Sequence, residues 1–437
     1  MAKISNISGF PEWLPEQKLA EDWVIEKIKG IYESHGFVPV ETPSVELMST
    51  LASKGVVDKE LYVLRRANAE DDGEAELGLH FDLTVPIARY IALHFNDLVF
   101  PFKRYQLQRA WRGERPQKGR FREFYQFDID TFGRNTLPLA CDAEILTVLD
   151  KVYRTLNLGN YVIRVNNRKI LLGLYSSLGL DGEQRQKAIV AIDKIDKLGE
   201  AAVLAELVDG VGVEAGTASK IVEFCKIKTT PEKLSATLSE LAITDELFAE
   251  GQRELEEVLF QLSSETQSKI EVCLSLARGL DYYTGLIFET LLVDYPEFGS
   301  VGGGGRYDGL VSQFSNQKVP GVGVSLGITR LMNFVFENNL LPLENKTPTR
   351  VLVSVYSEEQ RVACNEIADR VRACGVPTEV FFTSPKLGKQ IDYAAKKNIP
   401  FVLFVSAEDN SLRIKDINSG EQIDVDDLEQ WCGAIND

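Results

Sequence analysis

Residues 101–130 read PFKRYQLQRAWRGERPQKGRFREFYQFDID and concentrate positive charge. Eight Lys and Arg side chains lie between positions 103 and 122, in a chain of 437 residues whose formal net charge is −17. The second half separates a mostly apolar face from a polar one with a period of two, and the first half also has an extended pattern. Between them, Pro116 and Gly119 favour a loop. The segment therefore predicts a basic β-hairpin.

One face of this predicted hairpin suits an anionic ligand. In a strand, alternate side chains share a face, and here these are Arg122, Phe124, Gln126, Asp128 and Asp130. Arginine binds phosphate oxygens in pairs and an aromatic ring can stack on a base, so a nucleotide is one candidate ligand. The alternative is a surface hairpin whose charges are solvated.

Composition limits the kind of chemistry. The length predicts two or three domains, and 44% hydrophobic residues are ample for their cores. Because no run of 18 apolar residues occurs and residues 1–13 do not resemble a signal peptide, we expect a cytoplasmic protein without membrane contact. Six scattered cysteines without a CxxC pair argue against a zinc site and a disulfide framework. With only three histidines, chemistry here should depend on arginine and carboxylates.

The N-terminal third offers two further patterns. Residues 15–34 have apolar side chains at helical spacing, and the strand-like FVPVETPSVE that follows ends its alternation at Pro43. In HFDLTVPIARYIA (80–92), Asp82 and Thr84 are polar residues in an apolar stretch. Their position before Pro86 indicates a helix start, and a binding role is the alternative.

Three stretches near the middle predict a pocket. ARGLDYYTGLIFE (277–289) brings Arg278 to a strand edge beside two tyrosines, which suits an electrostatic clamp. GGGGRYDG (302–309) lets the backbone pass close to a ligand or a neighbouring strand. GVGVSLGITRL (321–331) predicts an apolar strand and then a helix that starts near Arg330.

The remaining chain is divided by composition. We expect a helical insertion at about 181–262; its glycines are spaced GxGxxxG, which argues against a dinucleotide fold. Residues 336–348 are expected to be a linker. Beyond it, residues 349–437 alternate strand and helix, which predicts an α/β domain with a mostly parallel sheet.

These motifs resemble those of class II aminoacyl-tRNA synthetases, most closely the histidyl-tRNA synthetase family. Residues 101–130 resemble motif 2, the N-terminal helix, strand and proline resemble the dimer-forming motif 1, and 321–331 resemble motif 3. RGLDYYTG at 278–285 closely matches a signature of the histidyl enzymes. The resemblance implies an α+β catalytic domain over 1–335, an antiparallel sheet flanked by helices, with the helical insertion and a C-terminal α/β anticodon-binding domain.

The resemblance also implies site residues. Arg112 and Arg278 would be catalytic. Gln117 and Arg115, at the hairpin tip, are candidates for contact with the tRNA acceptor end. Thr329 stands where relatives commonly have an acid, which would change how Arg330 is oriented. The residues implied for ATP are Arg112, Glu114, Arg120, Phe124 and Arg330. Those implied for histidine are Asp82, Thr84, Arg112, Gln126, Asp130, Arg278, Tyr282, Tyr283 and Tyr307.

The implied reaction is ATP-dependent ligation of L-histidine to its tRNA through histidyl-adenylate, by a homodimer. Mg²⁺ would be held mainly by the ATP phosphates, with no metal site made by the protein. The insertion would lie beside the tRNA acceptor arm or be a purely structural bundle. Two rivals share the fold: a histidine-sensing regulatory subunit of ATP phosphoribosyltransferase, and a class II synthetase for another amino acid.

Overall fold

The computed structural model describes residues 4–52, 61–67, 76–116, 119–278, 282–343, 345–406, 408–409 and 411–436. Their contacts divide the chain into two compact units. One comprises the described residues of 1–11 and 24–338, and the other comprises residues 12–23 and those described from 339 on. The domain boundaries predicted from the sequence stay a prediction.

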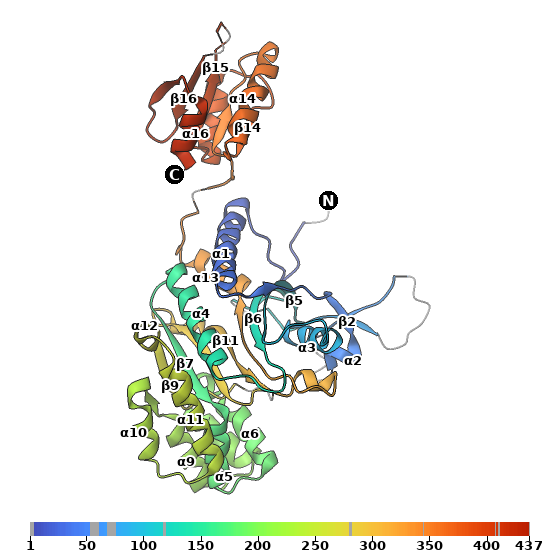
Figure 1. Ribbon diagram of the computed structural model, residues 1–437, viewed down its shortest axis with the longest axis vertical. Helices are drawn as coiled ribbons and strands as arrows, with labels where there is room; N and C mark the ends of the chain where they lie inside the picture. Colours follow the sequence, from blue (N-terminus) through green and yellow to red (C-terminus); the bar gives the residue numbers. More distant parts are fainter. Residues whose placement is uncertain are drawn as a thin grey trace. The chain divides into compact units, whose positions relative to one another are not determined.

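The larger unit is built on a nine-stranded sheet in the order β1-β5-β6-β12-β11-β10-β7-β9-β8 (Figure 1). Only β1–β5 and β7–β9 pair in parallel among these described strands. The strands are β1 (Val38–Pro39), β5 (Phe102–Trp111), β6 (Glu123–Phe132), β7 (Tyr161–Asn167), β8 (Lys228–Thr229), β9 (Ile270–Cys273), β10 (Leu286–Leu292), β11 (Ser300–Tyr307) and β12 (Gly321–Gly327). The antiparallel sheet expected from the sequence is confirmed.

The predicted hairpin is β5 and β6, paired from Phe102↔Phe132 to Trp111↔Glu123. Its alternation separates two environments. Phe127 packs against Tyr32 of helix α1 (Pro15–Ser34), with ring centroids 4.9 Å apart. The adjacent residue, Gln126, points to the opposite face of the sheet and lines a cavity. One face of β6 thus builds the core and the other is free to bind.

Helices cover the sheet and form the inserted region. The helices of the larger unit after α1 are α2 (Met48–Leu51), α3 (Thr84–Leu93), α4 (Ala140–Leu156), α5 (Arg168–Ser177), α12 (Ser264–Gln267) and α13 (Ile328–Glu337). The predicted insertion contains α6 (Gly182–Ile192), α7 (Ile195–Leu198), α8 (Glu200–Ala205), a π-helix (Glu206–Gly210), α9 (Ala215–Cys225), α10 (Leu234–Ser239) and α11 (Glu246–Phe260). Short 3₁₀ turns lie at Pro231–Lys233, Pro296–Phe298 and Val311–Gln313.

The larger unit also contains a three-stranded antiparallel sheet, with its strands in the order β2-β4-β3. Its strands are β2 (Val45–Leu47), β3 (Tyr62–Leu64) and β4 (Leu77–Leu79). In the register, Leu47 and Leu64 both lie opposite Leu77, so these three side chains share a face. All three are exposed.

The smaller unit contains a five-stranded sheet in the order β14-β13-β15-β16-β17. The expected mostly parallel sheet is wrong, because β13 pairs in parallel with β14 and β15 whereas β15–β16 and β16–β17 are antiparallel. The connections between the last three strands, residues 406–411 and 417–421, are short in sequence, and a short connection permits only antiparallel pairing. The elements are β13 (Val351–Val353), a 3₁₀ turn (Glu358–Gln360), α14 (Arg361–Ala373), β14 (Thr378–Val380), α15 (Leu387–Lys397), β15 (Phe401–Val405), β16 (Leu412–Asp416), β17 (Gln422–Val425) and α16 (Leu428–Asn436).

Two expectations from composition can be compared with this structure. All six cysteines are free. None of the described helices is long and apolar enough to cross a membrane.

Candidate active site

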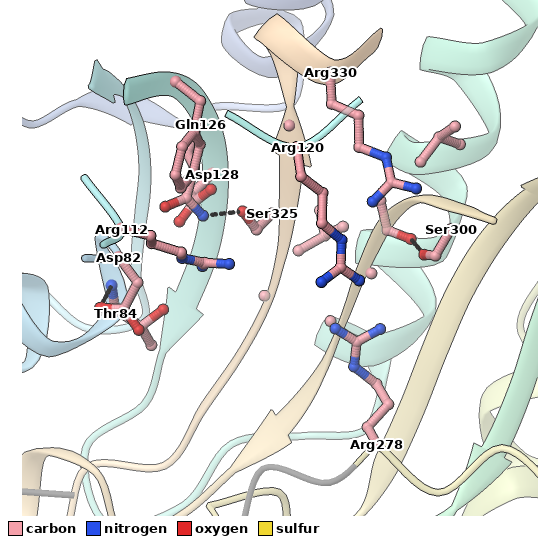
Figure 2. Close-up of a pocket in the computed structure, with 18 of the residues that line it drawn as sticks. Asp82, Thr84, Arg112, Arg120, Gln126, Asp128, Arg278, Ser300, Ser325 and Arg330 are labelled. Carbon is pink, nitrogen blue, oxygen red and sulfur yellow. Dashed lines mark hydrogen bonds between the residues drawn. The ribbon is translucent and has the colours of Figure 1, made fainter. Parts of the chain in front are cut away.

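A cavity of about 370 Å³ opens on the face of the main sheet formed by β6, β12 and β11. Figure 2 shows polar side chains extending into it from several elements. Every residue that the sequence implied for ATP or histidine lines this cavity. These residues are Asp82, Thr84, Arg112, Glu114, Arg120, Phe124, Gln126, Asp130, Arg278, Tyr282, Tyr283, Tyr307 and Arg330.

Arginines line both ends of the cavity, with Arg112 on one side and Arg120 and Arg330 on the other (Figure 2). Arg112, just after β5, lies with its guanidinium 5.0 Å from the ring centroid of Phe124 and donates from Nε to the carbonyl of Phe81 at 3.1 Å. Arg120, in the hairpin loop, lies 3.7 Å from a carboxylate oxygen of Glu114. A flat ring beside fixed cations is suited to a base and its phosphates.

Arg330 lies in the first turn of α13. Its guanidinium stacks 4.7 Å from the ring centroid of Phe298 and donates to the Phe298 carbonyl. Burial, followed by the charge of Arg120, lowers the pKa of Arg330 from its ordinary value. The neighbouring Thr329 accepts a 2.8 Å hydrogen bond from the backbone N–H of Tyr125. This hydrogen bond links the start of α13 to β6 through Thr329, the position noted above for its departure from the usual acid.

Arg278 enters the cavity from the loop after β9. Its backbone is left-handed, with φ +47°. Its guanidinium lies 5.8 Å from the ring centroid of Tyr283 and its Nη1 is 3.5 Å from the carbonyl of Phe288. A Cβ added at Gly303 would lie 2.2 Å from this Nη1. Glycine at 303 therefore makes the room that the guanidinium occupies.

The end of the cavity that holds Arg112 also carries Asp82, Thr84, Gln126 and Asp128, away from Arg120 and Arg330 (Figure 2). Asp82 accepts 3.2 Å hydrogen bonds from the backbone N–H groups of Thr84 and Val85, so it caps α3, the helix-start role expected from the sequence. Gln126 donates to Ser325 at 2.7 Å. The rings of Tyr282 and Tyr283 lie 4.5 Å apart between centroids.

Asp130 is held by two partners at the base of this end. It forms an ion pair with the fully buried Arg104 and accepts a hydrogen bond from the hydroxyl of Tyr307. Burial raises the pKa of Asp130, while Arg104 and Tyr307 act in the opposite direction. A histidine ligand that used Asp130 would share the carboxylate with these two groups.

Asp128 is a lining residue that the sequence assigned no role. It lies between Gln126 and Asp130 on the same strand face, and burial raises the pKa of its carboxyl to about 7. Its buried Oδ1 has no hydrogen-bond partner among the described residues. The period of two that placed Gln126 and Asp130 together was the signal that could have identified it.

Of the two candidates for tRNA contact, the structure describes only Arg115. Arg115 is exposed in the hairpin loop and does not line the cavity. Gln117 lies outside the described residues. Contact of either residue with tRNA stays a prediction.

The comparison with known proteins bears on this arrangement. The model of the histidyl-tRNA synthetase family matches residues 9–331. A protein named histidine–tRNA ligase from Thermobifida fusca is 43% identical over 430 residues, which cover 98% of each chain. The chain belongs to the histidyl-tRNA synthetase family.

Other histidyl-tRNA synthetases also match this family member over nearly its full length. A histidine–tRNA ligase from Micrococcus luteus is 40% identical over 453 residues, covering 100% of this chain and 98% of the relative. The histidyl-tRNA synthetase structure from Nostoc sp. PCC 7120 has a TM-score of 0.89 at 36% identity and 100% coverage of both chains. The model of an anticodon-binding domain matches residues 341–434. The predicted family and class II fold are confirmed, and the chain is an enzyme, a histidine–tRNA ligase.

The rival considered from the sequence shares the fold. A structure described as an ATP phosphoribosyltransferase regulatory subunit/histidyl-tRNA synthetase from Bacillus halodurans has a TM-score of 0.73 at 18% identity. This likeness concerns the fold alone.

Proposed function

We propose that this cavity forms histidyl-adenylate from L-histidine and ATP, and that the same chain then transfers the histidyl group to its tRNA. A histidine carboxylate oxygen attacks the α-phosphorus, and the bond to the departing pyrophosphate breaks. In the second step the hydroxyl of the terminal tRNA ribose attacks the carbonyl carbon, loses its proton, and AMP leaves. The observation that carries this proposal is that four arginines (Arg112, Arg120, Arg278 and Arg330) and four carboxylates (Asp82, Glu114, Asp128 and Asp130) line the same cavity.

The arginines of the cavity fit ATP. In a chain with net charge −17, Arg112, Arg120, Arg278 and Arg330 all line one cavity. Because arginine is permanently charged and binds oxygen pairs, such a set suits a polyphosphate. Arg112 and Arg278 would act at the α-phosphate and stabilise the charge that develops there, whereas Arg330 would hold the γ-phosphate.

The remaining nucleotide contacts involve the base and the metal. Phe124 would stack on adenine, Glu114 would accept from its amino group, and Arg120 would add a phosphate contact. Within the described ranges no group of three or more His, Cys, Asp or Glu side chains is arranged to hold a metal ion. Mg²⁺ would arrive with ATP, since Mg²⁺ is commonly held by substrate phosphates. When bound, it would neutralise phosphate charge.

The carboxylates of the cavity fit histidine. Asp82 and Thr84 would receive the ammonium group at the start of α3, and Gln126 would join them. Asp130, Tyr282, Tyr283 and Tyr307 would surround the imidazole. A buried polar set of this kind rejects side chains that leave it unpaired, which favours histidine without a separate editing site.

We also propose a homodimer and a cytoplasmic location, where translation uses charged tRNA. The support for the dimer is the exposed apolar face of the small sheet, which carries Val45, Leu47, Leu64 and Leu77. An exposed apolar patch of this kind marks an interaction surface. It adjoins the segment that resembles the dimer-forming motif.

The test of the reaction is ATP–pyrophosphate exchange with each of the twenty amino acids offered singly. Exchange with histidine alone supports the adenylate chemistry and the pocket assignment together. Folded protein that exchanges with none of them would overturn the proposal in favour of a regulatory subunit. Exchange with a different amino acid would keep the chemistry and overturn the histidine assignment.

A further inference from the structure

The backbone at Arg278 needs an external support. Its φ of +47° lies in the left-handed region, which is disfavoured for residues with a Cβ because that atom approaches the following carbonyl. Backbones of this kind persist only where the surrounding structure holds them. The direction in which Arg278 leaves the chain, and hence the position of its guanidinium, depends on that support.

Arg168 supplies contacts to both ends of the segment that begins at Arg278. Its Nη1 donates to the carbonyl of Arg278 at 2.8 Å, with the Ala277 carbonyl at 3.5 Å. Its backbone N–H donates to the carbonyl of Gly285 at 2.8 Å. The side chain of Arg168 is nearly fully buried at the start of α5. One residue therefore contacts the backbone at Arg278 and again at Gly285, just before β10.

The two residues before Arg168 secure the same region. Asn166 donates from Nδ2 to the carbonyl of Leu276 at 2.9 Å. Asn167 caps α5 by accepting from the backbone N–H of Lys169 at 3.0 Å. The end of β7 therefore holds the backbone just before Arg278, and the cap by Asn167 secures the start of α5, where Arg168 lies.

The inserted helices reach the same guanidinium. Nη2 of Arg168 lies 3.4 Å from Oε1 of Gln186, which is on α6. Because a guanidinium is planar and has several fixed donors, it can contact the loop and α6 at once, whereas a lysine ammonium cannot span the same acceptors.

We propose that Arg168 is a positioning residue that fixes Arg278 at the α-phosphate end of the cavity, and that Gln186 connects the inserted helices to it. The inference rests on the role proposed above for Arg278. Arg168 acts through the backbone of Arg278 and touches no substrate. The inserted region thereby has a direct hydrogen-bonded route to the reacting end of the cavity.

A double-mutant cycle tests this inference in the full-length chain, with histidine-dependent ATP–pyrophosphate exchange as the readout. Arg278→Ala should lower kcat by about 10²-fold, as expected for the loss of one charge stabiliser. Arg168→Lys should lower kcat by about tenfold with the KM values for histidine and ATP little changed, since small misplacements of a catalytic group cost rate. The double variant should equal Arg278→Ala, because Arg168 acts only through Arg278.

The outcomes separate the inference from the function on which it rests. Wild-type kcat in Arg278→Ala overturns the function proposed for that residue. If Arg278→Ala is impaired while Arg168→Lys is not, or if the two losses multiply in the double variant, the positioning role is wrong. All variants are compared at a temperature where circular dichroism shows each to be folded.

Arg164→Lys is the matched control. Arg164 is on β7 and also bonds to the inserted region, through Asp196 at 2.7 Å, and to Glu271 at 3.0 Å. It makes no bond to the backbone of Arg278, so its replacement should leave kcat unchanged. An equal loss of kcat in Arg164→Lys would show that the effect comes from a general loss of packing, and it would overturn the inference. Gln186→Leu should lower kcat about two- to fivefold; an unchanged kcat removes the inserted helices from the proposal.

Discussion

Asp128 is a carboxyl group buried on the floor of the cavity. The groups that act on its charge are Arg104, Asp130 and Asp82, together with the hydroxyl of Ser325. Burial outweighs the attraction of Arg104, and the pKa rises from 3.8 to about 7. The folded chain therefore binds this proton more tightly than the unfolded chain does.

This shift predicts a pH dependence of stability. Above pH 3.8 the unfolded chain releases the proton while the folded chain retains it, so the contribution of Asp128 to stability decreases as the pH rises toward 7. Asp128→Asn cannot ionise. Its free energy of unfolding, relative to that of the natural chain, should therefore increase by about 2 kcal/mol between pH 5 and pH 7.5. Urea unfolding at both pH values measures this difference.

The exposed Asp209 provides a control for the same substitution. Asp209→Asn measures what the same substitution does to the free energy of unfolding at an exposed position. Asp130, which is buried beside Asp128, remains in both chains and its contribution largely cancels. A pH-independent difference for Asp128→Asn would show that its carboxyl is ionised in the folded chain well below pH 7.

At the residue scale, sequence reasoning found what periodicity and motif resemblance could report. Alternation along β6 placed Gln126 and Asp130 on one face, and the same alternation carried Asp128. The left-handed backbone of Arg278 had no such signal, because the residue is not a glycine and its support comes from Arg168, 110 positions earlier. Contacts over that distance depend on the completed fold.

Strand β11 shows how neighbouring glycines serve different purposes. A Cβ at Gly303 would meet the end of the Arg278 side chain, at 2.2 Å from Nη1, whereas a Cβ at Gly304 would lie 1.9 Å from the backbone carbonyl of Gly323 on β12. A side-chain end can move aside. A paired backbone cannot move without opening the sheet.

The two alanine substitutions should therefore have different effects. Gly303→Ala should displace the Arg278 guanidinium and lower the rate of pyrophosphate exchange by about 10²-fold, with a melting temperature close to that of the natural chain. Gly304→Ala should separate β11 from β12 and lower the melting temperature. Thermal unfolding and exchange assays on both variants check this; equal melting temperatures would contradict it.

At the element scale, local signals succeeded and long-range pairing was out of reach. The hairpin of β5 and β6 followed from alternation on either side of a loop. The C-terminal sheet was mispredicted because the turn signal Asn418-Ser419-Gly420, where Gly420 has φ +78°, was overlooked between β16 and β17. The position of β12 beside β6 is not encoded in either segment alone.

The exposed row of Leu47, Leu77 and Leu64 predicts the behaviour of the whole molecule in solution. If this face joins two copies, Leu47→Asp should convert the dimer to a monomer, because a charge would be buried without a partner. Sedimentation equilibrium measures the mass. Leu198→Asp, at another exposed leucine in the inserted region, is the control and should leave the mass unchanged. Equal masses for both variants would remove this face from the interface.

From the surface of the anticodon-binding unit we expect that tRNA binding can be weakened while adenylate formation is unchanged. Phe382 is 71% exposed and stacks on Phe381, with ring centroids 4.6 Å apart. Lys386 and Lys389 follow at the start of α15, whereas Lys396 and Lys397 are already paired with Asp392 and Glu379. An exposed ring beside exposed lysines is suited to an unpaired base and its phosphate.

Phe382→Ala should accordingly raise the KM for tRNA about tenfold or more, the scale of one lost base stack. Pyrophosphate exchange, which needs no tRNA, should not change. Aminoacylation kinetics with histidine tRNA measure the first effect. Val362→Ala, at another exposed apolar residue of this unit, is the control. A parallel loss of exchange would indicate misfolding.

The pairing of β6 with β12 also sets the order in which the molecule is completed during its synthesis. Gln126 on β6 and Ser325 on β12, which are hydrogen-bonded to each other, are 199 residues apart. At about 5–20 residues per second, the ribosome needs roughly 10–40 s to produce the second after the first. Throughout that interval the hairpin has an unpaired edge and the cavity lacks a wall. The nascent chain must therefore avoid aggregation throughout this interval, before it can bind any substrate.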